Sequence, residues 1–532
     1  MNIQHHLKGR PAHRKSRSAV AIAVLVLTSA CGGAASQSTS ASGSGAEQPQ
    51  RGGDLRFAQP VDVKQLDPVA AVETQTIWVL DMMYETLTAT SRDGRKTDPW
   101  LAQSWDTSAD QLTWTFHLRT GVKFSDGSPM TAADVKFSLD RSRNFQGGFS
   151  FIDSAIASVD APDTNTVVIK TKYPWKPLLA DLALWANAVY PKDFGGKSEA
   201  AFFKSPIGTG PFKLDHWTPG VETKMVRNPY YWQPGKPYLD SVTWPFVPDD
   251  NTRNLQLKGG QIDIDQFAPF ATLASLKSTP GIKVQIFDSN VVSYVLINER
   301  VKQYQDVHVR RAIAYAIDAE TMAKASLYGY GSVACSFVAP TMAYYDPNTP
   351  CLKHDLDKAK AELAQSAYPN GFNTRILVGG TDVYQESVGE IVQQQLKPLN
   401  INVTLQKVDP GQLYATLSKY DYDLSYEAWA SDIPDPDEQI SFMCDPVGGG
   451  AGSYSTDYKN PQVVEWVHEA EKAFDESKRA ELYSKIQAQV AQDAPWVVLH
   501  FIPWQYAFSD KVHGFFVYPT ANYHLQDVWL SK

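Results

Sequence analysis

The spacing of apolar residues changes near residue 295, and this change most limits which folds the chain can adopt. Before it, apolar and polar residues alternate, as at Leu112, Trp114, Phe116 and Leu118, which is the two-residue period of a half-buried β-strand. A helix is predicted over 131–142, with Thr131 as its N-cap. Three more segments share the strand pattern: 167–172, 222–228 and 283–287.

After residue 295, helical spacing alternates with strand patterns. Val309, Ala312, Ile313 and Ala316 recur on one face of a predicted helix. Two more segments have helical spacing and four have strand patterns: 355–367 and 461–492, and 374–379, 402–408, 422–429 and 495–501. This alternation predicts an α/β lobe with a mostly parallel sheet.

The size and composition of the chain indicate a large globular protein. A chain of 532 residues exceeds what one hydrophobic core ordinarily serves, so two or more lobes are predicted. The hydrophobic share of 43% and charged share of 20% are typical of globular proteins. The formal net charge of −9, without an evident basic patch, argues against a nucleic-acid partner.

The first 30 residues have the features of an export signal. Residues 1–18 hold five Lys or Arg and no acidic side chains, and residues 19–30 are small or apolar apart from Thr28 and Ser29. An apolar run of this length is too short to span a bilayer, which takes about 20 residues. Residues 1–30 are therefore predicted to be a signal peptide.

The residues that follow predict a lipid anchor. Residues 27–31 read LTSAC and resemble a bacterial lipobox, with Thr28 where an aliphatic residue is usual. Lipid chains on Cys31 would make the protein a cell-membrane lipoprotein on the extracytoplasmic face. Residues 31–53, rich in Gly, Ser and Ala, are predicted to be a flexible tether. The alternative is a plain cleaved signal in which Cys31 is incidental.

Three further cysteines lie in the globular part of the chain. Outside the cytoplasm, Cys335 and Cys351 are candidates for a disulfide across a loop that contains Pro and Tyr residues. The alternative is that all three are buried thiols. Cys444 has no evident partner.

Residues 428–437 read AWASDIPDPD and place Asp432, Asp435 and Asp437 close to Trp429. Burying these carboxylates near an indole is costly unless a positive group compensates them. The sequence leaves four candidates for that group: a metal, a catalytic proton, a structural Lys or Arg, and a cationic ligand.

Motifs for catalysis, metals and cofactors are incomplete. His468 and Glu469 begin like a zinc-protease helix, but Lys472 stands where the second His is required. The acids at 435 and 437 lack the Gly and the distal Glu of a calcium loop. We therefore predict no enzyme activity, no metal and no cofactor, and rank a secreted hydrolase third among the function hypotheses.

Several phrases together resemble the family 5 extracytoplasmic solute-binding proteins, which serve ABC importers of peptides, nickel and related solutes. The similarity runs from about residue 53 to the C-terminus. The matching phrases occur in family order: QLDPVAAVE at 65–73, the block 97–141, GTGPFKLDHW at 208–217, 227–244, GGQIDI at 259–264, 306–318 and WASDIPDPD at 429–437.

The resemblance implies an α/β, two-lobed, periplasmic-binding-protein-like fold of type II, with an extra subdomain inserted in lobe I. Two crossover strands would join the lobes, which close over solute as a hinge. The implied boundaries are lobe I at 54–294 with its insertion at about 91–205, lobe II at 295–503, and a return to lobe I at 504–532.

The resemblance also implies a ligand site at the AWASDIPDPD segment. In peptide-binding members, the acid three residues after the Trp receives the α-ammonium of the peptide, and that acid is Asp432 here. The other implied ligand contacts are Trp429, Ala430 and Ser431, with Glu73 and Thr74 facing them from lobe I. Asp435 and Asp437 are expected to cap the next helix or to hold a turn.

The implied function is a monomeric receptor that captures a peptide and delivers it to an ABC permease. Dipeptide binders tend to place an Arg for the ligand carboxylate near the helix at 383–396, where this chain has Glu386 and Ser387 instead. This departure favours a longer peptide over a dipeptide. It also leaves open a non-peptide solute, such as an opine, a sugar, an amine-bearing metabolite or a metal chelate.

Overall fold

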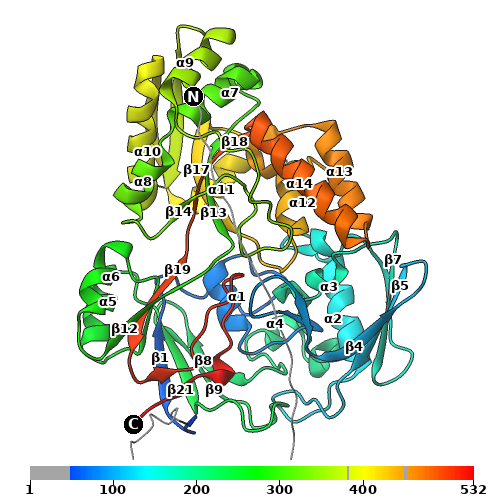
Figure 1. The fold of residues 1–532 in the computed structure, drawn as a ribbon. Coiled ribbons are helices and arrows are strands. Elements are labelled where there is room, and N and C mark those ends of the chain that lie inside the picture. The colour runs from blue at the N-terminus through cyan, green and yellow to red at the C-terminus, as the bar shows by residue number, and fades with distance from the viewer. Residues whose placement is uncertain (1–47, 380–382, 448–452) are drawn as a thin grey trace, which may run out of the picture. The chain divides into compact units, whose positions relative to one another are not determined.

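Three larger β-sheets organise the residues that this computed structural model describes, 48–379, 383–447 and 453–532. The first sheet has seven strands in the order β12-β19-β11-β1-β10-β9-β8 (Figure 1). These strands are β1 (Asp54–Ala58), β8 (Phe212–Thr218), β9 (Glu222–Arg227), β10 (Ser241–Pro245), β11 (Ile264–Gln266), β12 (Ile282–Phe287) and β19 (Trp504–Ser509). Leu55 and Phe57 of the central strand are fully buried, so the core of this lobe, lobe I, lies against β1.

The second sheet belongs to the segment predicted as an insertion. It is antiparallel and has the order β4-β5-β7-β6, with β4 at Ala102–Thr107, β5 at Thr113–Leu118, β6 at Ile156–Asp160 and β7 at Thr166–Thr171. Burial alternates along β5 as the sequence predicted, with Trp114 and Phe116 inside. Helix α2 (Ala132–Asn144) begins at Thr131, whose backbone N–H donates to Asp134 Oδ2 at 2.7 Å. The predicted N-cap is therefore confirmed.

The third sheet forms the centre of lobe II and has the order β14-β18-β13-β17-β15-β16. Its strands are β13 (Val291–Ile297), β14 (Ser332–Val333), β15 (Phe372–Gly379), β16 (Ile401–Val408), β17 (Leu424–Ala430) and β18 (Trp496–Phe501). Only the pairs β15–β16 and β15–β17 are parallel. The prediction of a mostly parallel sheet is wrong, because β13 and β18 carry the chain into and out of this lobe and run antiparallel to their neighbours.

Helices cover both faces of the lobe II sheet. Val295 and Ile297 of β13 pack with α7 (Val307–Ala316) and α10 (Val383–Leu396). Val292, Tyr294 and Leu296, which alternate with them, belong to the core that contains α12 (Asp437–Cys444), α13 (Pro461–Lys472) and α14 (Glu476–Asp493). The predicted helical segment 461–492 is thus two helices, since Asp475 caps α14 by accepting a bond from Lys478 N at 2.8 Å.

Two short connections join the lobes. The chain leaves β12 at Phe287 and enters β13 at Val291, and it leaves β18 at Phe501 and enters β19 at Trp504. The connections are bonded to each other, because Ser289 Oγ donates to Ile502 O. The implied boundary at 294/295 falls inside β13, which pairs wholly in the lobe II sheet. The domain boundaries themselves stay a prediction.

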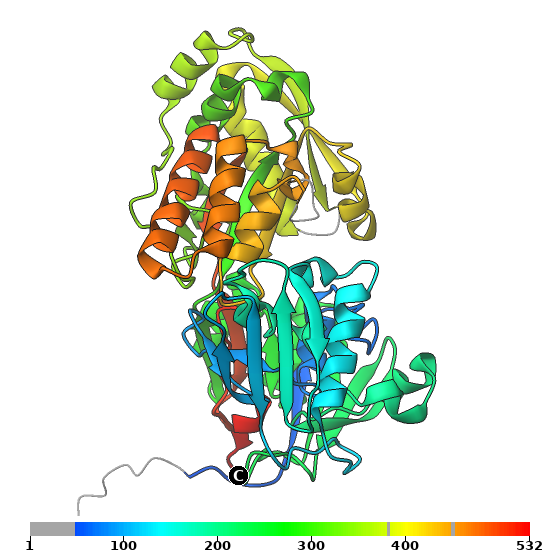
Figure 2. The same cartoon turned by 90° about the vertical axis from the view of Figure 1, so that its right-hand side faces the viewer.

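Helices α12, α13 and α14 stand over the inserted segment (Figures 1 and 2). Lys176 of that segment pairs with Glu476 of α14 at 2.7 Å. Lys176 N also donates to Glu471 O of α13 at 2.8 Å. The insertion is therefore one of the surfaces through which lobe I meets lobe II.

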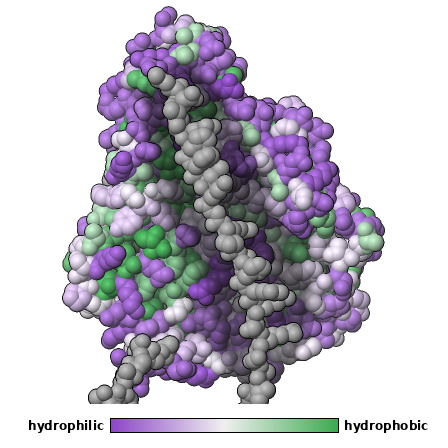
Figure 3. Space-filling model, in the orientation of Figure 1, coloured by the Kyte–Doolittle hydropathy of each residue, from purple (hydrophilic) through white to green (hydrophobic). Residues whose placement is uncertain are grey.

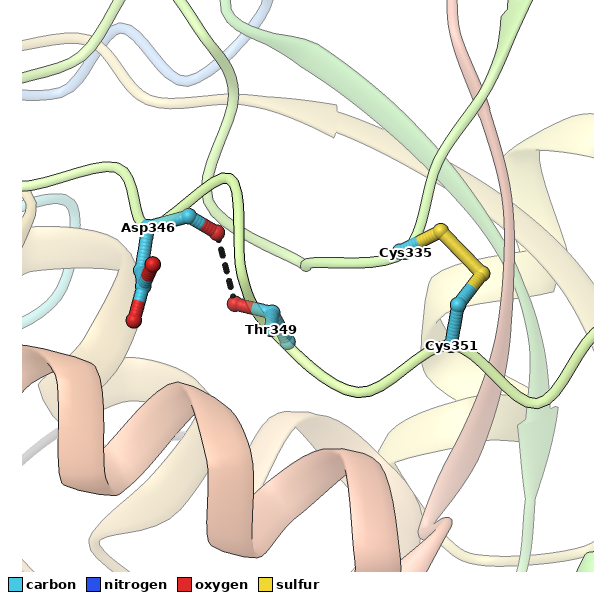
Figure 4. The surroundings of a disulfide bond; sticks show 4 residues. All are labelled: Cys335, Asp346, Thr349 and Cys351. Carbon is cyan, nitrogen blue, oxygen red and sulfur yellow. Dashed lines mark hydrogen bonds between the residues drawn. A yellow bond between two sulfur atoms is a disulfide. The ribbon is translucent and has the colours of Figure 1, made fainter. Parts of the chain in front are cut away.

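Cys335 and Cys351 are joined by a disulfide, with their Cα atoms 4.8 Å apart (Figure 4). Thr349 Oγ1 donates to Asp346 O at 2.8 Å in the enclosed loop. Cys444 is a buried free thiol in α12.

Large apolar side chains are exposed beside the lobe I sheet. Figure 3 shows hydrophobic residues gathered over α5 (Asp250–Lys258), α6 (Phe270–Lys277) and β12. Leu255 of α5 is 69% exposed, and Tyr330 stacks on Phe270 of α6. None of the predicted ligand contacts belongs to this patch.

The predicted signal peptide, Cys31 and most of the predicted tether lie outside the described residues. Among the residues that are described, no helix is both long enough and apolar enough to cross a membrane.

Candidate functional site

The segment predicted to bind ligand follows directly from β17. This strand ends with Trp429 and Ala430, both half-buried, and the chain then turns through 431–436 into α12. The carboxylate of Glu438 stabilises this turn, because its Oε2 accepts hydrogen bonds from Asp432 N at 2.7 Å and from Ser431 Oγ at 3.0 Å. Ser431 is buried and Asp432 partly buried, so Ser431 supports the turn and Asp432 presents the carboxylate.

The segment lies where the two lobes meet. Asn290, in the first connection between the lobes, donates through Nδ2 to Ser431 O at 3.4 Å. Its own N–H donates to Pro519 O in the C-terminal part of lobe I at 2.9 Å. Ile433 is fully buried in the lobe I core although it follows a lobe II strand. Movement between the lobes would therefore act directly on residues 429–433.

Asp432 has no basic partner among the described residues. The pKa of its carboxyl is raised well above the ordinary value, first because burial removes water from it and then because of the nearby carboxyl of Glu438 and the charge of Asp81. A hydrogen bond with Trp429 opposes this rise. The site therefore holds carboxyl groups that no lysine or arginine among the described residues pairs with.

Asp435, only three residues away, is compensated. The guanidinium of Arg479 donates to both of its carboxylate oxygens, at 2.6 and 3.0 Å. Asp435 Oδ1 also accepts from Asp437 N at 2.9 Å at the start of α12. Asp435 thus holds the turn into the helix, as expected, and the structural Arg that the sequence left open belongs to it.

Lobe I contributes an acid that the sequence reasoning missed. Asp81 follows helix α1 (Thr74–Leu80), and its Oδ2 accepts from Asn522 Nδ2 at 2.5 Å. Burial raises its pKa to about 7, and its charge acts on Asp432. The only indication of Asp81 in the sequence was its position shortly after residues 65–73, one of the segments that resemble the family.

Glu73 and Thr74 lie at the N-terminus of α1. Glu73 is the N-cap residue and makes no side-chain capping bond, and its Oε2 is buried without a hydrogen-bond partner among the described residues. Thr74 is exposed. Within the described chain, neither residue hydrogen-bonds to the segment 429–432, so their predicted role across the cleft depends on a ligand.

The helix expected to carry a ligand-binding Arg in dipeptide binders is α10, and Glu386 of this helix pairs with Lys407 at 2.7 Å. Glu386, which this chain has near the position of that Arg, therefore forms its ion pair within lobe II.

Among the described residues, no cluster of three or more His, Cys, Asp or Glu side chains has the arrangement of a metal site.

Known proteins share the sequence and the architecture of this chain. Residues 96–451 match the bacterial extracellular solute-binding proteins, family 5 (middle). The glutathione-binding protein GsiB of Escherichia coli O1:K1 is 30% identical over 475 residues, which cover 88% of this chain and 92% of that protein.

Two solved structures are also similar along nearly their whole length. The periplasmic binding protein DppA from Helicobacter pylori, in complex with the peptide STSA, has a TM-score of 0.81 at 28% identity and covers 91% of this chain and 99% of its own. The binding protein AgaA from A. tumefaciens R10, in complex with agropinic acid, has a TM-score of 0.80 at 27% identity, with coverage of 90% and 99%. This likeness confirms the predicted two-lobed type II fold.

Proposed function

The chain belongs to the bacterial extracellular solute-binding proteins of family 5, which are transport proteins and not enzymes, and we propose that it captures peptides through their free amine. The observation that carries this proposal is Asp432, a carboxyl beside Glu438 and near Asp81 with no basic partner among the described residues. A ligand ammonium would supply the missing positive charge in a charge-assisted hydrogen bond.

Ligand capture would be linked to movement of the lobes. Asp81 belongs to lobe I and Asp432 follows a lobe II strand, so an ammonium held by both favours the arrangement in which the lobes are together. The short connections at 288–290 and 502–503 are the natural hinge. Trp429, Ala430 and Ser431 would border the ligand, and Glu73 and Thr74 would contact it from lobe I.

Oligopeptides are the first candidates. The structurally similar protein from H. pylori holds a tetrapeptide, and α10 lacks an Arg that would fix the carboxylate of a dipeptide. A non-peptide solute, such as an opine, a sugar, an amine-bearing metabolite or a metal chelate, is the second candidate, because the similar protein AgaA holds agropinic acid.

The binding protein would act as a monomer that delivers its ligand to an ABC permease, from a lipid anchor on Cys31 at the extracytoplasmic face of the cell membrane. The basic leader, the short apolar run and LTSAC support the anchor. Changing Cys31→Ser should release the protein from washed membranes into the medium. If Cys31→Ser cells retain it on the membrane, the anchor is refuted.

Calorimetry with the full chain tests ligand capture. Free-amine tetrapeptides are titrated against N-acetylated twins of the same sequence, and native mass spectrometry identifies any solute that co-purifies. Tight binding of the free peptides and loss of binding after acetylation are expected. Equal binding of both twins would exclude the role of the amine, and a co-purified solute that is not a peptide would favour the second candidate.

A further inference from the structure

A cavity of about 270 Å³ lies between the inserted segment and the helices of lobe II. The insertion supplies Phe151, Tyr173 and Trp175 to its wall, while α12 and α13 supply the polar side. A cavity of this volume has room for the end of a long side chain. Figure 2 shows α12 and α13 above the insertion at this junction.

The polar wall is acidic. Four carboxyl groups line the cavity: Asp437, Glu438, Asp445 and Glu471. Asp445 already pairs with His468 Nε2 at 2.8 Å, and the buried Arg479 nearby is committed to Asp435. Lys472 also borders the cavity; it is exposed, its Nζ lies 5.5 Å from the centre of the Tyr173 ring, and its charge acts on Glu471 without forming an ion pair with it. Acidic side chains therefore outnumber basic ones on this wall.

Glu471 is the carboxyl that most clearly lacks a partner. It is 7% exposed, lines the cavity from the last turn of α13, and its carboxylate makes no hydrogen bond or ion pair in the described part of the chain. Burial raises its pKa to about 9, with further contributions from Asp437 and Asp445. A buried and unpaired carboxyl of this kind is stabilised when a cation enters the cavity.

The aromatic residues connect this cavity with the proposed amine site. The ring of Phe442 lies 4.8 Å from that of Trp429 and 5.8 Å from that of Phe151, which stacks on it. Glu438 also belongs to both places, because it lines the cavity and holds the turn at Asp432. One ligand that extends from Asp432 past Phe442 would therefore meet the acidic wall.

We propose that this cavity receives the ammonium or guanidinium group of a ligand side chain, so that the preferred ligands are peptides that contain lysine or arginine. Glu471 and Asp437 would bind the cation, and the ring of Trp175 would add a cation–π contribution. This inference rests on the proposed function and adds a substrate class to it.

The test compares matched tetrapeptides on the full chain by calorimetry. At each position in turn, a lysine peptide is paired with its norleucine twin, which keeps the four-carbon stem and lacks the ammonium. At one position the lysine peptide is expected to bind roughly 10-fold more tightly. Glu471→Gln should remove most of this preference and leave the affinity for the norleucine twin unchanged, which also shows that the variant is folded.

Glu469→Gln is the matched control. Glu469 lies on the same helix, is exposed and pairs with Lys478 at 3.4 Å, so this variant should keep the preference for lysine. Equal affinity for the twins at every position, or a preference that Glu471→Gln does not change, would overturn the inference alone. If neither twin binds, peptide capture itself fails and the inference falls with it.

Discussion

Asp435 and Arg479, 44 positions apart in the sequence, form a buried ion pair in which two guanidinium nitrogens donate to the two carboxylate oxygens at 2.6 and 3.0 Å. Arg479 is 1% exposed. This pair fixes the start of α12 against α14, and the other hydrogen bonds of the guanidinium go to Ala470 O and the Tyr483 hydroxyl. Asp432, three residues before Asp435, is left for a positive group that comes from outside.

Arg479→Met should destabilise lobe II. Removing one partner leaves the charge of Asp435 buried and unpaired, which costs about 3–5 kcal/mol of unfolding free energy. Chemical denaturation followed by tryptophan fluorescence measures the loss. Replacing both partners, as in Arg479→Met with Asp435→Leu, should restore part of it, and a loss below about 1 kcal/mol in the single variant would contradict this account.

Asp432→Asn should weaken binding of free-amine ligands by about 10- to 100-fold, since hydrogen bonds to charged groups contribute about 1.5–3 kcal/mol. The variant keeps the shape of the side chain, so the fold should be unaffected. Calorimetry measures the affinity. Asp421→Asn, at an exposed carboxylate that pairs with Arg375, is the control and should bind as the unmodified chain does. Unchanged affinity in Asp432→Asn would remove this residue from the site.

The stability of the empty protein should depend on Asp81 as pH changes. Its pKa is about 7 in the folded protein and near 3.8 in the unfolded chain, so the folded state retains a proton that the unfolded state loses between these values. The contribution is present at low pH and lost as pH rises through about 7. The change of melting temperature between pH 5 and pH 8 should therefore be smaller in Asp81→Asn, and an identical change in both proteins would argue against a raised pKa.

Ligand affinity should rise from pH 6 to pH 8. The carboxyls that face the ammonium must lose protons before they attract it, and the pKa values of Asp81 and Asp432 are both raised. The α-amino group of a peptide loses its charge above about pH 8, so affinity should fall again at higher pH. Calorimetry in buffers of different ionisation enthalpy should also detect proton release on binding, and a flat profile would count against the site.

Loss of the disulfide should destabilise the loop of lobe II that it encloses. Cys335 and Cys351 are 16 positions apart, and a loop of about 15 residues corresponds to about 3 kcal/mol in the chain-entropy account. Denaturation of the double variant Cys335→Ala and Cys351→Ala measures this loss. Reductant should lower the stability of the unmodified chain but not of the double variant, and equal responses would indicate a different cause.

Local structure was largely predictable from the sequence. The alternation around Trp114 predicted a strand, and Thr131 predicted the start of a helix, because both depend on neighbours in the chain. The sheet of lobe II was predicted less well. Its antiparallel pairs depend on β13 and β18, which connect the lobes, and the strand pattern alone carries no information on direction.

The candidate site was predictable only as a segment. The family resemblance singled out Asp432. That Asp435 is paired with a cation and Asp432 is not could not be predicted, because the partner of Asp435 is Arg479, which lies far along the sequence. Asp81 and Glu471 could not be predicted for the same reason, since packing between distant elements decides whether a carboxyl meets a cation. Glu438 is close in sequence, yet its position beside Asp432 follows from the turn at 433–436.

The position of β19 in the lobe I sheet determines when lobe I can finish folding. This strand pairs with both β11 and β12 although it comes from the last 30 or so residues of the chain. During synthesis and export, β11 and β12 each have an unpaired edge until almost the whole polypeptide is available. In a chain truncated before Trp504, these edges would stay unpaired, and unpaired strand edges favour aggregation with other copies of the chain.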